Sequence, residues 1–262
     1  MLPVTFENPF DRTSQPARVV ALIPSRYASI RFPGKALADL DGLPVIEHVY
    51  RRAAAARRVD AVVVATDDDR IAAAVARFGG HARMTSAAHR TGTDRIAEVA
   101  RALPCAIVIN VQGDEPLVDP ADIDRLVAAL EAPGAAPMAT LRCRLDAAER
   151  DTPHVVKVVV DAAGRALAFS RAAEPAVPAG AGVPSPRVWK HIGLYGYQRD
   201  FLLRFAALPQ TPGERAEALE QLRALEHGHA IDTVETPHDS VGIDTPADLE
   251  LARRRLAPAP FR

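Results

Sequence analysis

Residues 19–65 open with VVALI (19–23), continue through PVIEHVYRRAA (44–54) and close with AVVVA (61–65). The first and last runs are short, continuous and rich in valine, which is typical of strands buried on both faces of a sheet. In the middle run the apolar residues recur at the three- and four-residue spacing of a helix face, and Pro44 stands where a helix begins. The stretch therefore predicts a strand, a helix and a second strand parallel to the first.

The same alternation continues along the chain. Helical patterns begin near residue 68 and span 93–103, the run AIVINV (106–111) is a third buried strand, and another helical pattern spans 120–130. Strands that alternate with helices of this length predict an α/β fold with a mainly parallel sheet and helices on both faces.

The rhythm changes between about residues 138 and 198. Strand patterns at 155–160, 167–170 and 191–197 predict a smaller antiparallel β region, and the proline-rich segment 174–186 is expected to be a loop. Helices return after Arg199, and the spacing of TPAD (245–248) predicts a capped helix start. We expect one domain over residues 18–262, preceded by a flexible tail over residues 1–17.

Composition excludes several classes of protein. The 262 residues carry 32 basic and 33 acidic side chains and a net charge of −1, which argues against a nucleic-acid or membrane-surface protein. The N-terminal stretch lacks the apolar run of a signal peptide, so we expect a cytoplasmic protein without membrane insertion. The two cysteines lack the spacing of a zinc site or a disulfide framework. Only three basic residues are lysines, at positions 35, 157 and 190.

The loop PSRYASIRFPGK (24–35) is the first candidate for chemistry. It follows the first strand, and residues 18–38 contain four basic residues and no acidic one. Arg26, Arg31 and Lys35 could hold a polyphosphate, and Gly34 would let backbone N–H groups approach it. The loop matches neither a Walker A motif nor GxGxxG, and composition alone favours a solvated basic turn.

Two aspartates form the second candidate. Asp114 in NVQGDEP (110–116) leaves a buried strand beside a glycine, and Asp244 in VGIDTP follows a strand-like segment and precedes a helix. Two carboxylates that meet across the sheet would suit magnesium, which also takes water and phosphate oxygens. The alternatives are a turn in which Asp114 bonds backbone amides and a helix cap at Asp244.

Two further segments are more polar than a core requires. TGTDR (91–95) opens a helix with donors that could contact a base or ribose, and capping is the alternative. In KHIGLYGY (190–197) strand alternation places His191 and Tyr195 on the same side, although such residues are usually structural.

Taken together, the segments resemble the bacterial 3-deoxy-D-manno-octulosonate (Kdo) cytidylyltransferases, or CMP-Kdo synthetases. The matching pieces occur in the family's order from Arg18 to about Leu256; they are IPSRYASIRFPGKAL, VVATDDDRIA, TGTDRIAE, INVQGDEP, VVKVVVDAAG, FSRA, KHIGLYGY, LEQLRALEHG and VGIDTPADLE. The chain departs from the family's pattern at His154 and Glu174.

The resemblance implies a nucleotidyltransferase (Rossmann-like) fold, magnesium dependence and a homodimer built partly through the β region. It implies the transfer of CMP from CTP to Kdo, with release of pyrophosphate, for lipopolysaccharide synthesis. The implied catalytic residues are Arg26, Lys35, Asp114 and Asp244, and the two aspartates are the implied metal ligands. The implied nucleotide contacts are Pro24, Ser25, Arg26, Gly34, Lys35, Thr91, Gly92, Gln112 and Asp114. The implied sugar contacts are Gln112, Arg171, His191, Tyr195 and Glu220.

Three alternatives remain open at this point. A cytidylyltransferase for another acidic sugar, such as sialic acid, would share the chemistry. A metal-dependent glycosyltransferase would need a DxD pair, for which only Asp67 and Asp69 in ATDDDR have the spacing. A catalytically silent nucleotide-binding regulator is the third.

Overall fold

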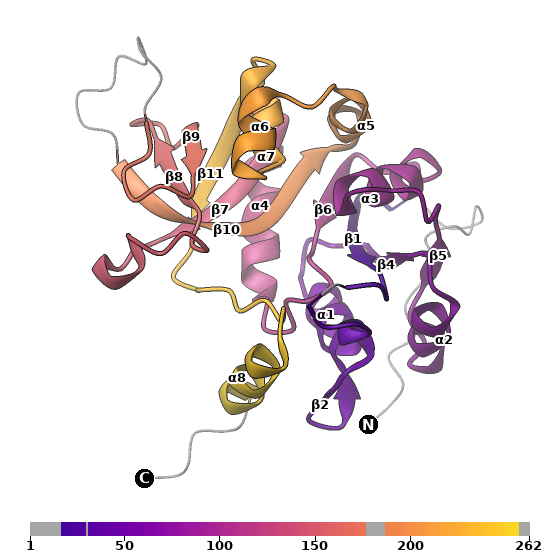
Figure 1. The fold of residues 1–262 in the computed structure, drawn as a ribbon. Coiled ribbons are helices and arrows are strands. Elements are labelled where there is room, and N and C mark those ends of the chain that lie inside the picture. Colours follow the sequence, from indigo (N-terminus) through magenta and orange to yellow (C-terminus); the bar gives the residue numbers. More distant parts are fainter. Residues whose placement is uncertain (1–16, 30, 177–186, 257–262) are drawn as a thin grey trace. The chain divides into compact units, whose positions relative to one another are not determined.

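The computed structural model describes residues 17–29, 31–176 and 187–256 (Figure 1). The chain divides into two compact units. Unit 1 runs to Asp124 and resumes at Ser240, and unit 2 comprises Arg125–Asp239. The smaller β region predicted at 138–198 lies within unit 2, whereas most of the predicted 1–17 tail and residues 177–186 of the predicted loop lie outside the described residues.

A parallel sheet forms the centre of unit 1. Its strand order is β6 (Ile107–Asn110), β1 (Val19–Ser25), β4 (Ala61–Thr66) and β5 (Ala82–Met84). Every residue of β4 and β6 is buried, as expected for strands covered on both faces. The predicted parallel α/β sheet is confirmed.

Three helices cover this sheet. They are α1 (Val45–Ala54), α2 (Asp69–Arg77) and α3 (Gly92–Arg101). Right-handed crossovers place α1 and α2 on one face and α3 on the other, as Figure 1 shows. The chain progresses from β1 through β4 to β5 and then returns through α3 to β6, on the other side of β1. The strand order therefore reverses between β1 and β6, and ligands of open α/β sheets bind at such a switch point.

Shorter elements complete unit 1. The 3-10 helix η1 (Lys35–Leu37) is followed by a two-stranded ribbon of β2 (Asp39–Leu40) and β3 (Leu43–Pro44). The final helix α8 (Pro246–Leu256) begins where the TPAD motif predicts. Thr245 and Asp248 cap it, because the Asp248 carboxylate accepts from the Thr245 N–H at 2.8 Å. The helix α4 (Pro120–Glu131) spans the boundary in sequence between the two units.

Unit 2 is mainly antiparallel. β10 (Arg187–Gln198) pairs with β7 (Met138–Cys143) and with β8 (Lys157–Val160), and β8 pairs with β9 (Ala166–Ser170), all antiparallel. These strands confirm the predicted antiparallel β region. β11 (Ile231–Glu235) adds to β7 in parallel orientation. The remaining elements are η2 (Ala147–Glu149), α5 (Arg199–Ala207), α6 (Pro212–Glu217) and α7 (Gln221–Glu226).

One strand-like prediction is wrong. Residues 241–243, which precede Asp244, are not a strand, because Ile243 packs into an apolar cluster under α8 instead of pairing in a sheet. The strand that precedes this segment is β11, which ends at Glu235.

Candidate active site

Lys35 follows a tight loop that leaves the carboxyl end of β1. The Gly34 N–H donates to the Tyr27 carbonyl at 2.9 Å and closes the loop. Gly34 has a φ of 72°, and a Cβ atom there would lie 3.0 Å from the Tyr27 ring. Both the left-handed backbone and the approach of the ring therefore require glycine. Arg70 stacks on the same ring, with its Cζ 3.3 Å from the centroid, so α2 supports the loop.

Asp114 enters the same region from the neighbouring strand β6. A Cβ atom on Gly113 would lie 2.7 Å from the Pro24 carbonyl oxygen, so glycine lets this turn approach the end of β1. A Cβ atom on Gly92 would lie 3.1 Å from Cγ of Pro24. Three predicted nucleotide-binding segments therefore meet around Pro24, at the switch point of the sheet.

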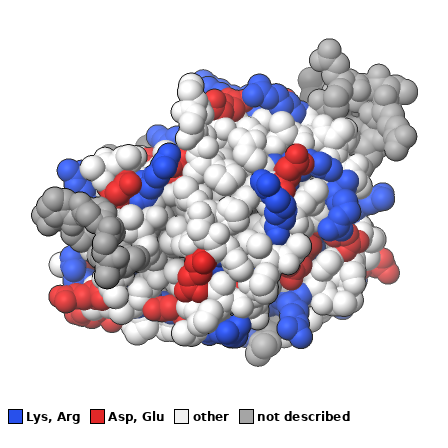
Figure 2. Space-filling model, turned by 90° about the horizontal axis from the view of Figure 1, so that it is seen from above, with Lys and Arg blue, Asp and Glu red and all other residues white. Residues whose placement is uncertain are grey.

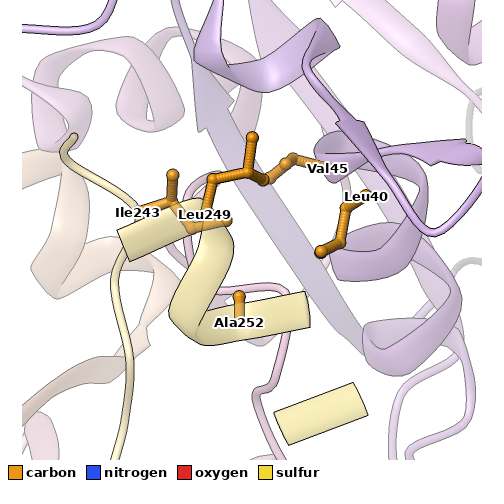
Figure 3. Close-up of a cluster of buried hydrophobic side chains, with 5 residues drawn as sticks. All are labelled: Leu40, Val45, Ile243, Leu249 and Ala252. Carbon is orange, nitrogen blue, oxygen red and sulfur yellow. The ribbon is translucent and has the colours of Figure 1, made fainter. Parts of the chain in front are cut away.

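Asp244 reaches the site through backbone and apolar contacts. The Ile243 N–H donates to the Asp114 carbonyl at 2.8 Å, which fixes the two aspartate segments side by side. Figure 3 shows the apolar cluster to which Ile243 belongs, which comprises Leu40, Val45, Ile243, Leu249 and Ala252. Phe32 of the Lys35 loop and Leu117 of the Asp114 loop pack against this cluster. One small core thus positions all three charged groups.

The three charges meet in one ion cluster. Lys35 Nζ lies 2.5 Å from Oδ2 of Asp114 and 3.0 Å from Oδ1 of Asp244. Arg31 pairs with the other oxygen of Asp244 at 2.8 Å. Burial lowers the pKa of Lys35, but the two carboxylates outweigh this effect and raise it above its ordinary value. The site therefore holds a permanent cation between two carboxylates that stay partly exposed, at 30% and 43%.

The predicted nucleotide-side residues differ in their surroundings. Arg26 is exposed, whereas Ser25 is buried. Thr91 caps α3, because its hydroxyl accepts from the Asp94 N–H at 3.1 Å, which bears out the structural alternative for that side chain. Gln112 is half-buried at the end of the β6 segment.

The carboxylates of ATDDDR serve structural purposes. Asp67 pairs with Arg95 at 2.8 Å, and Asp68 caps α2 by accepting from the Arg70 N–H at 3.0 Å. Asp69 is exposed in the first turn of α2. Of the DxD pair, Asp67 is therefore held in an ion pair and Asp69 lies exposed on the helix, while the cap is Asp68 between them.

Four predicted sugar contacts lie in unit 2. His191 and Tyr195 share a face of β10, as alternation predicts, with ring centroids 5.5 Å apart. Arg171 follows β9, and its N–H and Nε both donate to Glu217 at 3.0 Å. Glu220 is the N-cap residue of α7.

Sequence reasoning missed some of the residues that build the site. It did not identify the Tyr27 and Arg70 stack, the Ile243 backbone contact or the pairing of Arg31 with Asp244. The glycine before Asp114 and the apolar residue before Asp244 were the available signals. Neither signal specifies a partner that lies far away in the sequence.

Comparison with known proteins identifies the family. The family model of the cytidylyltransferases matches residues 20–231. A 3-deoxy-manno-octulosonate cytidylyltransferase of Geobacter sulfurreducens is 53% identical over 247 residues, covering 91% of this chain and 99% of the relative. The chain belongs to the 3-deoxy-manno-octulosonate cytidylyltransferase family. Another member, from Syntrophotalea carbinolica, is 54% identical over 238 residues, which cover 88% of this chain and 95% of that protein.

One solved structure supports the family, and a second, more distant one shares the fold alone. A CMP:2-keto-3-deoxy-manno-octonic acid synthetase complexed with CTP is 44% identical, with a TM-score of 0.84 that covers 91% of this chain and 98% of that one. A 4-diphosphocytidyl-2C-methyl-D-erythritol synthase from Anaerococcus prevotii shares the fold at 14% identity and a TM-score of 0.59. The 3-deoxy-manno-octulosonate cytidylyltransferase resemblance of the motifs is thereby confirmed.

On the face in Figure 2, basic and acidic side chains are interspersed around an uncharged area instead of forming a patch of one sign. Within the described ranges, no helix has both the length and the apolar character needed to cross a membrane.

Proposed function

We propose that this enzyme transfers CMP from CTP to 3-deoxy-D-manno-octulosonate and releases pyrophosphate, a step toward lipopolysaccharide. The observation that carries the proposal is the ion cluster of Lys35, Asp114 and Asp244 at the switch point of the sheet. Family membership supplies the two substrates, since relatives identical at about half of their positions carry this activity in their names.

The reaction is an in-line displacement at the α-phosphorus of CTP. The anomeric hydroxyl of the sugar acid releases its proton to solvent and its oxygen attacks. The bond between the α-phosphorus and the oxygen that bridges to the β-phosphate breaks, and pyrophosphate leaves with the electron pair. Such a transfer needs positioning and neutralisation of negative charge more than covalent chemistry. Lys35 and Arg26 are the cations that we assign to the phosphates, and the raised pKa keeps the Lys35 ammonium protonated at neutral pH.

The two aspartates fit a divalent metal, and we propose Mg²⁺. One oxygen of each carboxylate already faces a common cation, the Lys35 ammonium, and both side chains are open enough to admit water and phosphate oxygens. Across the described part of the chain, no cluster of three or more His, Cys, Asp or Glu residues has a metal-binding arrangement, so a closed zinc-type site does not fit. Mg²⁺ commonly uses one or two carboxylates together with substrate phosphates. When bound, it would neutralise charge on the phosphate oxygens.

The remaining contacts are inferred from the motif match. We assign Pro24, Ser25, Gly34, Thr91, Gly92 and Gln112 to the nucleotide. We assign Gln112, Arg171, His191, Tyr195 and Glu220 to the sugar acid. We also propose that the enzyme is cytoplasmic and forms a homodimer through the β region at 138–198. Light scattering of the purified protein tests the dimer by its mass.

Pyrophosphate release from CTP and Mg²⁺ tests the substrate assignment. The assay compares Kdo, sialic acid and no acceptor, and we expect release only with Kdo. Release with sialic acid alone would show that the enzyme uses another acidic sugar in place of Kdo. Release with neither acceptor would overturn the proposal.

Two variants test the site in the same assay. We expect Asp114→Ala and Asp244→Ala to abolish turnover while circular dichroism shows a folded protein, because each removes a ligand of the proposed metal. Substantial activity in either variant would contradict the assignment.

A further inference from the structure

The hydroxyl of Thr140 lies at the centre of a buried hydrogen-bond cluster in unit 2. Thr140 is on β7 and fully buried, and its Oγ1 lies 3.0 Å from Nε2 of His191. The same oxygen lies 3.1 Å from the Ile192 carbonyl and 2.9 Å from the Leu194 carbonyl. One hydroxyl therefore contacts three groups of β10.

A β-bulge creates this convergence. Ile192 pairs with Leu141, but the next pair joins Tyr195 to Thr140, so β10 advances three residues while β7 advances one. Gly193 and Leu194 fall outside the register of the ladder, and the carbonyls of Ile192 and Leu194 both turn toward the same side chain.

Counting hydrogens assigns the donor of each bond. A threonine hydroxyl has one hydrogen and two lone pairs, and a carbonyl can only accept. If that hydrogen pointed at the imidazole, both carbonyl oxygens would face a hydroxyl oxygen without a proton between them. The hydrogen therefore points toward the two carbonyls, where Thr140 Oγ1 donates to both in a three-centre bond, and the Thr140 oxygen accepts from the Nε2–H of His191.

The histidine is held in this state by its surroundings. Burial lowers the pKa of His191 to about 3, so the ring is neutral at physiological pH. Phe169 meets the ring edge-on at 5.0 Å, and Tyr195 flanks it at 5.5 Å. With the proton on Nε2, the other ring nitrogen, Nδ1, has a free lone pair and can only accept a hydrogen bond.

We propose that Thr140 is a positioning residue that fixes His191 as the Nε2–H tautomer, so that Nδ1 accepts a hydroxyl group of the sugar acid. This inference rests on the proposed contact between His191 and the sugar. It adds a constraint to that contact, because a neutral acceptor binds an O–H group and repels a carboxylate. The carboxylate of the substrate must therefore bind elsewhere.

Nitrogen NMR of the full-length protein tests the tautomer without any assumption about function. With ¹⁵N-labelled histidine, we expect the wild-type His191 signals to show a protonated Nε2 and an unprotonated Nδ1. Thr140→Ser should keep this pattern, and Thr140→Val, which removes the hydroxyl, should lose it. A protonated Nδ1 in the wild type would overturn the proposal, even if Thr140→Val does not fold.

Steady-state kinetics test the consequence for the substrate. We expect Thr140→Val to raise the KM for Kdo about 10-fold, the effect of one lost neutral hydrogen bond, with the KM for CTP unchanged. Thr140→Ser should restore the wild-type value. An unchanged KM for Kdo in folded Thr140→Val would also overturn the proposal.

Thr233→Val is the matched control. Thr233 lies opposite Thr140 in the β11–β7 register, and its buried hydroxyl accepts from Arg142 and donates to the Gly164 carbonyl at 2.6 Å, instead of contacting His191. It should leave both the tautomer and the KM for Kdo unchanged. If wild-type protein shows no turnover with any sugar acid, the proposed function fails, while the NMR result still decides the tautomer.

Discussion

Each of the three lysines places its ammonium group between two oxygen acceptors. Lys35 meets two carboxylates, Lys157 meets two backbone carbonyls and Lys190 meets two carboxylates. All three are largely or fully buried, in a chain whose other 29 basic residues are arginine. A compact ammonium fits such positions, whereas the planar guanidinium of arginine requires more room. Lysine therefore occurs where a compact ammonium fits between two oxygen atoms, and at Lys35 those oxygen atoms belong to the active site.

Replacing Lys35 tests whether this lysine acts in catalysis and is not only structural. We expect Lys35→Met to lower turnover on the order of 10²-fold or more, because it removes a charge held beside the reacting phosphates. Lys190→Met is the control, since Lys190 pairs with Glu149 and Asp239. It should affect unfolding more than turnover, and a near-wild-type rate for folded Lys35→Met would contradict the assignment.

The burial of His191 predicts a dependence of stability on pH. Its pKa is about 3 in the folded protein, compared with 6.5 for an exposed histidine. Between these values the unfolded chain binds a proton that the folded chain does not, so stability falls as the pH drops from about 6.5 toward 3. The thermal midpoint of the wild type should fall more steeply over this range than that of His191→Gln. Identical slopes for wild type and His191→Gln would refute the prediction.

At the scale of elements, two connections position the charges. One is the loop from β1 to η1, which Gly34 and Tyr27 close, and the other is the segment before α8, which the apolar cluster of Figure 3 holds. Both connections lie outside the strands of the central sheet. Their geometry can therefore be disturbed while the sheet remains intact.

Gly34→Ala tests the loop. The added Cβ atom would be strained at a φ of 72° and would also meet the Tyr27 ring at 3.0 Å. We expect a loss of roughly 2–3 kcal/mol in the free energy of unfolding, together with reduced turnover. Gly42→Ala carries a similar φ of 83° with no atom within 4 Å, and it should cost only about 1 kcal/mol. Equal losses in urea unfolding would show that the Tyr27 contact is unimportant.

Leu249→Ala tests the support beneath Asp244. Leu249 is 7% exposed in the apolar cluster, so its truncation should cost about 2–5 kcal/mol and lower turnover by displacing Asp244. Leu251 lies on the same helix but is 37% exposed, and its change to alanine should cost under about 0.5 kcal/mol. Urea unfolding and the pyrophosphate assay measure both variants. Full activity in destabilised Leu249→Ala would show that the packing of α8 does not position Asp244.

At the scale of the whole molecule, the helices and strands could be predicted from the sequence better than the contacts between them. The runs at 61–65 and 106–111 identify central strands because they are continuously apolar and buried on both faces. β5 escaped prediction because it is short and largely exposed, and β11 because polar residues interrupt its apolar pattern. The two strands lie at the edges of their sheets, where the apolar signal is weakest.

For the active site too, the residues could be predicted from the sequence, but the contacts between them could not. The sequence identified Lys35, Asp114 and Asp244 separately, but their contacts depend on long-range packing. Lys35 and Asp244 are 209 positions apart, and the strand order, the cluster under α8 and the Ile243 backbone bond to Asp114 bring them together. The tautomer of His191 depends on a β-bulge that strict alternation does not contain.

The central claim is nucleotidyl transfer from CTP to Kdo, and ³¹P NMR of a single reaction mixture tests it most directly. With wild-type enzyme, CTP, Mg²⁺ and Kdo, we predict that the CTP signals give way to equal amounts of pyrophosphate and a phosphodiester that retains the α-phosphorus. Omitting Kdo should leave CTP unchanged. Formation of inorganic phosphate and CDP in place of these products, or consumption of CTP that does not depend on Kdo, would contradict the account.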